Sequence, residues 1–262
     1  MFVSVVIPSR NDGEMLARCL ASLANQRRVP DEIVVVDNGS TDDTRSIAEG
    51  GGARVVWEPI PGIPRASAVG FDAAKGDLIA RVDADSVCPP EWLERVVAAF
   101  ENDPALDLIS GSGEFYDAGP ITRRLGKSWW IGGLYWSMTI YLSHPPIFGS
   151  NFAMRRAVWT EIGPEIHREE RNIHDDLDLS LHIKPWMHVR YDRDLVVGIS
   201  ARPFSNWSGF IRRLSWVIPT LRNHWPEDSP WARRAARRKF ESARRETAAR
   251  DVPPTPRVIP PN

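Results

Sequence analysis

Several features that would define a functional class are scarce or missing in this sequence. The 33 basic and 34 acidic residues leave a formal net charge of −1, so bulk electrostatics gives no support for nucleic-acid binding. The two cysteines, Cys19 and Cys88, cannot form a disulfide framework, which favours a reducing compartment. The GxGxxG fingerprint and the Walker GxxxxGK[ST] loop are both missing, which argues against a dehydrogenase or a P-loop enzyme.

Membrane-targeting patterns are missing as well. The opening residues MFVS lead directly into a strand pattern, without a basic segment or a cleavage site, so we expect no signal peptide. No predominantly apolar run reaches the roughly 18 residues that a membrane-spanning helix needs. We expect a cytoplasmic protein, with peripheral contact at the inner face of the membrane as the alternative.

Strand and helix patterns alternate along the first hundred residues. An apolar content of 42% in 262 residues is enough for a sizeable core. Apolar strands interleaved with amphipathic helices predict an α/β fold with a Rossmann-type, mostly parallel sheet covered on both faces. The predicted strands are residues 2–7, 32–36, 54–57 and 77–82, and the predicted helices are residues 14–25, 43–49 and 64–75.

Polar residues follow three of these strands at their carboxyl ends. They are residues 9–11 (SRN), Asp37 with Asn38, and Asp83 with Asp85. Parallel α/β sheets bind ligands in the crevice at that edge, so the pattern predicts a nucleotide site.

Asp83 and Asp85 point to one side of a strand end, because side chains at i and i+2 share a face. Two such carboxylates repel each other unless a cation lies between them, and a hard divalent ion bound with substrate phosphates fits that position. The alternative is that both merely cap the next helix, which is expected to begin near Pro89.

Three segments in this order resemble the family 2 glycosyltransferases of GT-A fold. They are residues 3–11 (VSVVIPSRN), residues 33–42 (IVVVDNGSTD), and residues 74–77 (AKGD) followed by the Asp83–Ala84–Asp85 motif. The resemblance extends over about residues 3–185 and implies transfer of a sugar from a nucleotide-diphosphate sugar. The expected donor is a UDP-sugar, with GDP- and dTDP-sugars as alternatives.

The resemblance also assigns roles to the residues of the donor site. It implies that Pro8, Arg10 and Asp37, with the adjacent Asn38, hold the base and ribose. Asp85 would bind Mn²⁺ or Mg²⁺ at the diphosphate. Asp83 would lie near the ribose or a metal-bound water, and is a second candidate metal ligand.

One position departs from the family pattern. Members often carry Ala-Arg-Asn where this chain has Ala66–Ser67–Ala68, and the nearest arginine is Arg65. Arg65 either binds the diphosphate or is only a solvated residue at the start of a helix.

The acceptor half carries two further family-like segments. In residues 148–156, Gly149 and Asn151 are expected beside the acceptor, although the segment alone predicts only a turn before a helix at 157–162. In residues 174–181 (HDDLDLSL), the resemblance makes Asp176 the base that deprotonates the acceptor hydroxyl, with Asp175 and Asp178 in support. Carboxylates in the first turn of a helix are favoured by the macrodipole in any case.

Histidines near this acidic segment suggest a different class of enzyme. His167 and His174 with Asp175 are compatible with a metal hydrolase. They lack the His-x-x-x-His spacing of a helical metal site, and such a site would leave the upstream motifs unexplained.

Aromatic and basic residues mark the second half. The uncharged residues 129–142, preceded by Arg123, Arg124 and Lys127, predict either a membrane-interface helix or a buried helix.

Residues 210–216 are similar to the segment that closes over the diphosphate in related enzymes. They are not the Gln-x-x-Arg-Trp of processive synthases, so we expect a single sugar addition. His224 is either a cap on the metal site or a surface histidine.

The C-terminal part predicts an arginine-rich helix over residues 231–250. Such a helix suits contact with anionic lipid, a solvated face or a dimer contact. We expect a GT-A-like domain over residues 1–200, divided near residue 110 into donor and acceptor halves. A helical extension over 201–250 and a proline-rich disordered tail over 251–262 would follow.

Taken together, the patterns predict a metal-assisted, inverting glycosyltransferase. Its acceptor would be a glycan or lipid-linked molecule of cell-envelope, polysaccharide or glycolipid synthesis. The alternatives are a non-catalytic nucleotide-sugar-binding or membrane scaffold protein and a sugar nucleotidyltransferase. The latter usually carries a glycine-rich basic loop after its first strand, which residues 9–13 do not resemble.

Overall fold

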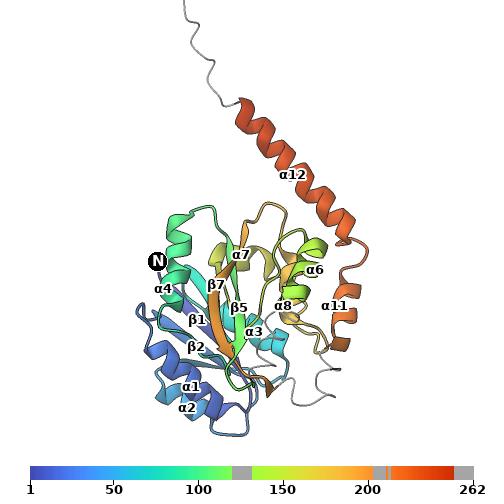
Figure 1. Ribbon diagram of the computed structural model, residues 1–262. Helices are drawn as coiled ribbons and strands as arrows, with labels where there is room; N and C mark the ends of the chain where they lie inside the picture. Colours follow the sequence, from blue (N-terminus) through green and yellow to red (C-terminus); the bar gives the residue numbers. More distant parts are fainter. Residues whose placement is uncertain (120–131, 203–210, 212–213, 251–262) are drawn as a thin grey trace, which may run out of the picture.

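The computed structural model describes residues 1–119, 132–202, 211 and 214–250. Seven strands form one mixed sheet in the order β3-β2-β1-β4-β6-β5-β7 (Figure 1). This arrangement confirms the predicted α/β class with a mostly parallel, GT-A-like sheet. The strands are β1 (Val3–Ser9), β2 (Glu32–Asp37), β3 (Arg54–Trp57), β4 (Leu78–Arg81), β5 (Leu108–Phe115), β6 (Phe152–Arg155) and β7 (Val189–Ile199).

The N-terminal half of the sheet is parallel and buried on both faces. β1 pairs with β2 on one side and with β4 on the other, and β2 pairs with β3, all in parallel. Val3, Val5 and Ile7 of β1 pack into one apolar cluster, while Val6 packs into a second cluster on the opposite face. This burial on both sides explains why β1 and β2 are almost continuously apolar in sequence.

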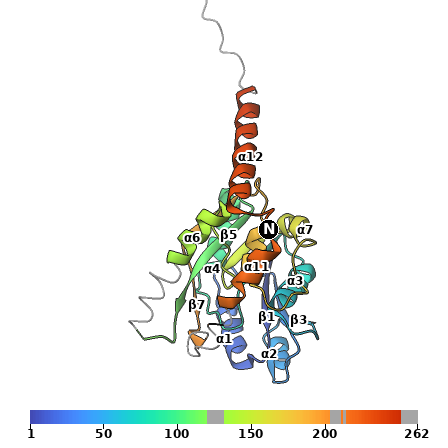
Figure 2. The same cartoon turned by 90° about the vertical axis from the view of Figure 1, so that its right-hand side faces the viewer.

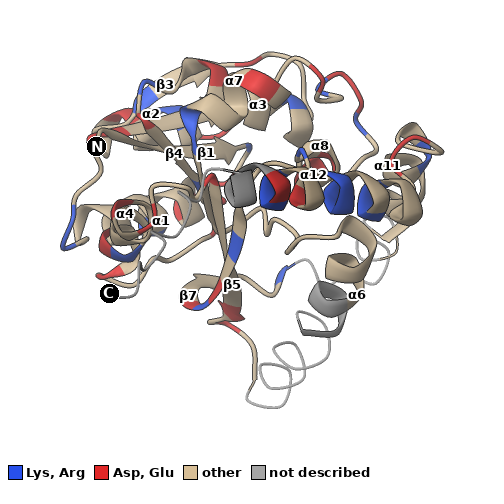
Figure 3. Cartoon of the chain, turned by 90° about the horizontal axis from the view of Figure 1, so that it is seen from above, with Lys and Arg blue, Asp and Glu red and all other residues tan. Residues whose placement is uncertain are grey.

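Helices cover the two faces of the sheet. One face carries α1 (Gly13–Ala24), α2 (Thr44–Gly50) and α4 (Trp92–Asn102). The other carries α3 (Ile63–Ala73), α7 (Arg156–Ile162) and α8 (Asp175–His182). The view from above shows α1 and α4 on the opposite side of the strands from α3 and α7 (Figure 3). The layers leave the carboxyl ends of β1, β2 and β4 at one edge.

The C-terminal half of the sheet differs from the sequence-based expectation in two places. β6 pairs antiparallel with both β4 and β5, where the sequence predicted only a turn before a helix. β7 is one strand with a register shift opposite Ser110 and Ser112 of β5, where the sequence predicted two short strands. The bulge keeps the pairing continuous through the polar interruption at residues 192–194.

Three helices complete the described chain: α6 (Gly132–Leu142), α11 (Val217–Asn223) and α12 (Pro230–Arg250). α12 runs outward from the body in two perpendicular views and is rich in Lys and Arg (Figures 1, 2 and 3). Arg233 anchors its first turns, donating from Nε to the carbonyl of Leu142 at 3.1 Å and from Nη1 to the carbonyl of Leu181 at 2.6 Å.

No helix among the described residues is both long enough and apolar enough to span a bilayer. The predictions for Arg123, Arg124 and Lys127 fall outside the described residues, as do parts of those for residues 129–142 and 210–216 and the tail from residue 251.

Candidate active site

Asp83 and Asp85 follow β4 at the carboxyl edge of the sheet, as the sequence predicts. The next helix, α4, begins at Trp92, and its N-cap residue is Glu91, without any side-chain capping bond. The alternative that the two aspartates cap this helix is therefore wrong. Asp83 instead bonds within the site, because the Ser150 hydroxyl donates to its Oδ2 at 2.6 Å.

Arg81, the last residue of β4, links the two acidic segments of the chain. Its side chain is only 4% exposed, and its Nη2 donates to Oδ1 of Asp83 at 3.0 Å. Its Nη1 donates to Oδ2 of Asp175, the first residue of α8, and the Ser67 hydroxyl donates to the same oxygen at 2.9 Å. The strand-end aspartates and the acidic start of α8 are thus joined in one network.

Asp176 lies next to Asp175 in the first turn of α8 and is half-buried. The backbone N–H of Gly149 donates to its Oδ2 at 3.2 Å, and that of Leu177 donates to its Oδ1 at 2.8 Å. Burial and then the neighbouring Asp175 charge raise the pKa of Asp176 above its ordinary value. A raised pKa makes the carboxylate a stronger base, which suits proton abstraction.

Gly149 fits this position because space beside Asp176 is limited. A Cβ at Gly149 would lie 3.2 Å from Asp176 Oδ2 and 3.5 Å from Arg81 Nη1. The segment that the sequence placed beside the acceptor therefore does contact the predicted base.

Asp85 has an environment that suits a cation. Burial and then the neighbouring Asp83 raise its pKa to about 6. Arg202, after β7, approaches Asp85 Oδ2 from Nη2 at 3.6 Å and contacts Asp12 Oδ1 from Nη1 at 2.9 Å. The carboxylates of Asp12, Asp83 and Asp85 lie at this edge and offer only oxygen atoms as ligands. Oxygen ligands are those that Mg²⁺ and Mn²⁺ prefer.

The predicted base-and-ribose residues lie at the same edge, with different exposures. Asp37 is buried, and its Oδ1 accepts from the N–H of Ser40 at 3.0 Å. Arg10 is exposed and Pro8 partly exposed. The amide of Asn38 is occupied within the protein, since it donates to the carbonyls of Glu58 and Ile60 and accepts from the N–H of Gly62. Asn38 therefore shapes the 58–62 loop beside the site.

Arg65 lies in the first turn of α3 and forms ion pairs with Glu58 and Glu169. Its side chain is only 24% exposed, so it is more than a solvated residue at the start of the helix. Its role at the diphosphate stays a prediction.

Two other predicted site residues are corrected by their burial. Asn151 is completely buried, and its amide donates to the carbonyls of Ser112 and Leu195 and accepts from the indole of Trp92 at 2.8 Å. It therefore cannot reach a sugar hydroxyl and instead ties α4 to the sheet.

His224 is likewise buried, and it contacts Asp178 and Asp228 rather than the aspartates that follow β4. It is neither a cap on the Asp85 site nor a surface histidine. Burial would lower its pKa, but hydrogen bonds to Asp178 and Asp228 outweigh this and raise it to about 9.

Sequence reasoning missed two groups of residues. One is the two arginines Arg81 and Arg202, which belong to none of the predicted motifs. The other is a cluster of His167, Asp178, His182 and His224, whose candidate ligand atoms lie within 4.8 Å of one another. The Asp178-x-x-x-His182 spacing, one turn of helix apart, was the available indication.

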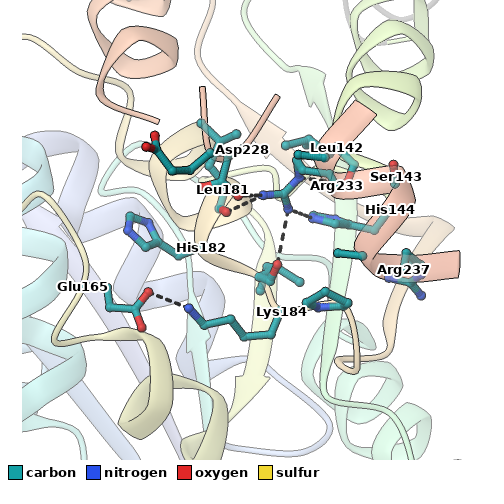
Figure 4. Close-up of a pocket in the computed structure, with 15 residues that line it drawn as sticks. Leu142, Ser143, His144, Glu165, Leu181, His182, Lys184, Asp228, Arg233 and Arg237 are labelled. Atoms are coloured by element: carbon teal, nitrogen blue, oxygen red, sulfur yellow. Dashed lines mark hydrogen bonds and ion pairs between the residues drawn. The ribbon is translucent and has the colours of Figure 1, made fainter. Parts of the chain in front are cut away.

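The pocket drawn in Figure 4 lies away from the strand ends. It is formed between the C-terminal end of α8 and the start of α12, and Arg233 points between Leu181 and His144 there. Its polar groups are largely paired, as in a packed helix junction, and it does not include Asp83, Asp85 or Asp176.

Comparison with known proteins agrees with this geometry. The model of the glycosyl transferase family 2 matches residues 4–163, more than half of the chain. The chain therefore belongs to glycosyl transferase family 2. An uncharacterized glycosyltransferase of Mycobacterium tuberculosis is 40% identical over 109 residues, which are 42% of this chain and 47% of that protein. The chain thus matches about half the length of this curated relative.

Solved structures share the fold at lower identity. Glucosyl-3-phosphoglycerate synthase of Mycobacterium tuberculosis, solved with Mn²⁺, uridine diphosphate and phosphoglyceric acid, superposes with a TM-score of 0.59 at 21% identity. That match covers 84% of this chain and 77% of the synthase. TarS of S. aureus, solved with UDP-GlcNAc, gives a TM-score of 0.57 at 20% identity and covers 75% and 57% of the two chains.

Proposed function

We propose that this chain is a metal-assisted, inverting glycosyltransferase that moves a sugar from a UDP-sugar to an acceptor hydroxyl. The observation that carries the proposal is the Arg81 network, in which one buried guanidinium binds both Asp83 and Asp175. The network joins the Asp83–Asp85 motif, which is expected to bind the donor, to the start of α8, which carries the expected base Asp176. Both lie at the edge of the sheet where α/β proteins bind ligands.

In this reaction Asp176 acts as the general base. Its raised pKa favours removal of the acceptor hydroxyl proton as the oxygen attacks the anomeric carbon. A single in-line displacement inverts the configuration at that carbon. Asp175 is held by Arg81 and Ser67, and it raises the basicity of Asp176 through its charge.

The donor is held at the ends of β1, β2 and β4. Pro8, Arg10 and Asp37 hold the base and ribose, and Asp85 is the main metal ligand, with Asp83, whose oxygens accept from Arg81 and Ser150, beside it. When bound, a divalent ion supplies charge stabilisation for the departing diphosphate. The uridine nucleotides and Mn²⁺ found with structural neighbours support this choice of donor and cofactor.

The proposed acceptor is a glycan or lipid-linked molecule of envelope, polysaccharide or glycolipid synthesis, extended by one sugar at a time. Residues 1–200 would form the catalytic domain and residues 201–250 the extension. The exposed Trp231 and the many arginines of α12 suit peripheral contact with anionic lipid.

Replacement of the base tests the proposal. Asp176→Asn is expected to slow the release of UDP from UDP-sugars by about 10²–10⁴-fold while leaving UDP binding intact. Transfer to water serves as the readout where no acceptor is known. Asp194→Asn, at an exposed carboxylate on β7, is the matched control and should keep the wild-type rate. An unchanged rate in Asp176→Asn would reject the assignment, and UDP binding without any turnover in the wild type would favour a binding protein.

A further inference from the structure

The cluster of His167, Asp178, His182 and His224 has the composition of a metal centre. Three of the six histidines of the chain converge on the carboxylate of Asp178. Its Oδ1 lies 2.7 Å from His167 Nδ1, 2.9 Å from His224 Nε2 and 3.7 Å from His182 Nδ1. We propose that His167, Asp178, His182 and His224 form a structural zinc site, separate from the nucleotide site at Asp85.

The spacing of these groups suits a tetrahedral ion. With zinc–ligand bonds of about 2.0–2.1 Å, neighbouring ligand atoms lie roughly 3.3 Å apart. Asp178 Oδ1 lies 2.7 Å from His167 Nδ1 and 2.9 Å from His224 Nε2, slightly less than this value, and one ligand atom from each of the four residues lies within 4.8 Å of the others. Three imidazoles and one carboxylate match the preference of Zn²⁺, whereas Mg²⁺ and Ca²⁺ prefer oxygen ligands.

The imidazoles are packed closely, and two of the three, His182 and His224, are buried, while His167 is 30% exposed. The ring centroids of His167, His182 and His224 are 4.6 to 5.4 Å apart. The side chains of Asp178, His182 and His224 are 1%, 8% and 3% exposed. A cation bound between the three rings would be balanced by the buried carboxylate of Asp178.

Groups around the cluster orient the ligands as in known zinc centres. His224 Nε2 faces Asp178, while its Nδ1 contacts Asp228 Oδ2 at 3.1 Å, which is the carboxylate–histidine–metal arrangement. His182 Nδ1 lies 2.8 Å from the carbonyl oxygen of Asp178, so a proton there leaves Nε2 for the ion. The backbone N–H of His167 donates to Asp178 Oδ2 at 3.0 Å.

Four protein ligands would leave no open position for substrate, so the site is structural. It joins three elements: the loop after α7, helix α8 and the end of α11 (Figure 1). Asp178 lies one turn after Asp175 on the same helix, so the ion would fix the catalytic start of α8 against the C-terminal extension. His182 and Asp228 also line the pocket of Figure 4, where Arg233 binds the end of α8.

The test is the metal content and zinc affinity of the full chain, purified without a histidine tag. We expect about one zinc per chain by elemental analysis. After the metal is removed, added Zn²⁺ should raise the melting temperature, whereas added Mg²⁺ should not. X-ray absorption should show imidazole nitrogens as the main ligands. A stripped wild-type chain that takes up no stoichiometric Zn²⁺ would overturn the proposal.

Variants separate this site from the nucleotide site and from surface binding. His182→Ala and His167→Ala should each lose at least tenfold in zinc affinity, measured by competition with a chromophoric chelator. His188→Ala, whose side chain is 49% exposed, and Asp85→Asn should retain wild-type affinity. His167, itself 30% exposed, is the variant least expected to disturb folding. Unchanged affinity in folded His167→Ala, or loss in Asp85→Asn, would refute the assignment. The outcome does not depend on whether UDP binds.

Discussion

At the scale of single residues, Arg81 is the group on which the site depends. A guanidinium that is almost completely buried is stable only where carboxylates surround it, and Asp83 and Asp175 supply them. Asp83 and Asp175 in turn need this charge, since each lies beside another aspartate. Removing the arginine would leave like charges facing one another.

Arg81→Gln is therefore expected to lower the free energy of unfolding by about 3 kcal/mol, because it leaves two uncompensated carboxylates in a poorly solvated site. Urea denaturation at neutral pH measures the loss. Arg45→Gln, which breaks the exposed Arg45–Glu49 pair on α2, should change it by less than about 1 kcal/mol. Equal effects of the two changes would mean that the network does not stabilise the fold.

His144 gives a prediction about pH. Burial, together with the nearby Arg233 and Arg237 charges, lowers its pKa to about 4. The unfolded chain, with the ordinary histidine pKa of about 6.5, then binds more protons than the folded chain between these values. The stability contributed by neutral His144 is complete above pH 6.5 and falls by about 3 kcal/mol as the pH drops through about 4.

The pH dependence of unfolding in wild type and His144→Gln measures this effect. The wild type should lose more stability than the variant between pH 7 and pH 4.5. His188→Gln, at a half-exposed histidine, should follow the wild type. Parallel curves for wild type and His144→Gln would contradict the prediction.

At the scale of elements, the close packing of α3 on the parallel sheet positions Ser67 beside Asp175. This packing depends on Gly70, where a Cβ would meet Val6 Cγ1 at 2.4 Å and Val36 Cγ2 at 2.9 Å. Both valines are buried and β-branched, so they have little freedom to move aside. The glycine sets the distance between helix and sheet.

Gly70→Ala should consequently destabilise the protein by about 1–3 kcal/mol through overpacking. Thermal or urea unfolding gives the value. Gly50→Ala, at the end of α2 with nothing within 4 Å of the added carbon, is the control and should be neutral or slightly stabilising. If Gly70→Ala proved as stable as Gly50→Ala, α3 would have to pack more loosely than described.

The parallel half of the fold could be predicted because its strands are apolar throughout and its helices are amphipathic. β6 could not, since its four residues, Phe152–Arg155, read as the end of a turn and gain strand structure only by pairing with β4 and β5. β7 was predicted as two strands because Asp192, Arg193 and Asp194 interrupt its apolar pattern, which the bulge accommodates. α11, which contains Pro219, lies within the predicted helical extension, but its bounds were not predicted.

The site, too, could be predicted from the sequence only in part. The acidic motifs could be predicted from their position after a strand and at a helix start. The partners that hold them, Arg81 and Arg202, could not, because these arginines pair with carboxylates that lie roughly a hundred residues or more away in the chain. Asn151 was assigned to the acceptor because its burial in three hydrogen bonds cannot be read from local sequence.

At the scale of the whole molecule, the C-terminal helices extend a catalytic α/β layer. The residue after α11, His224, and Arg233 in the first turns of α12 form hydrogen bonds with α8. The extension therefore packs against the helix that carries Asp175 and Asp176 and holds it in place. The rest of α12 leaves the body (Figure 2), and its Arg238, Arg244 and Arg245 are exposed. Contact of this arm with anionic lipid remains a proposal that the catalytic site does not require.

The most direct measurement is the thermal stability of the wild type and of Asp85→Asn with UDP, GDP and dTDP, with Mn²⁺ added or omitted. A nucleotide present at about a hundred times its dissociation constant stabilises the folded state by about 2.7 kcal/mol, which corresponds to roughly 5–10 °C in a chain of this size. We predict such a shift for UDP with Mn²⁺, a much smaller one without the metal, and little in Asp85→Asn. No shift with any nucleotide, or an equal shift in Asp85→Asn, would contradict a metal-dependent sugar-nucleotide site at the end of β4.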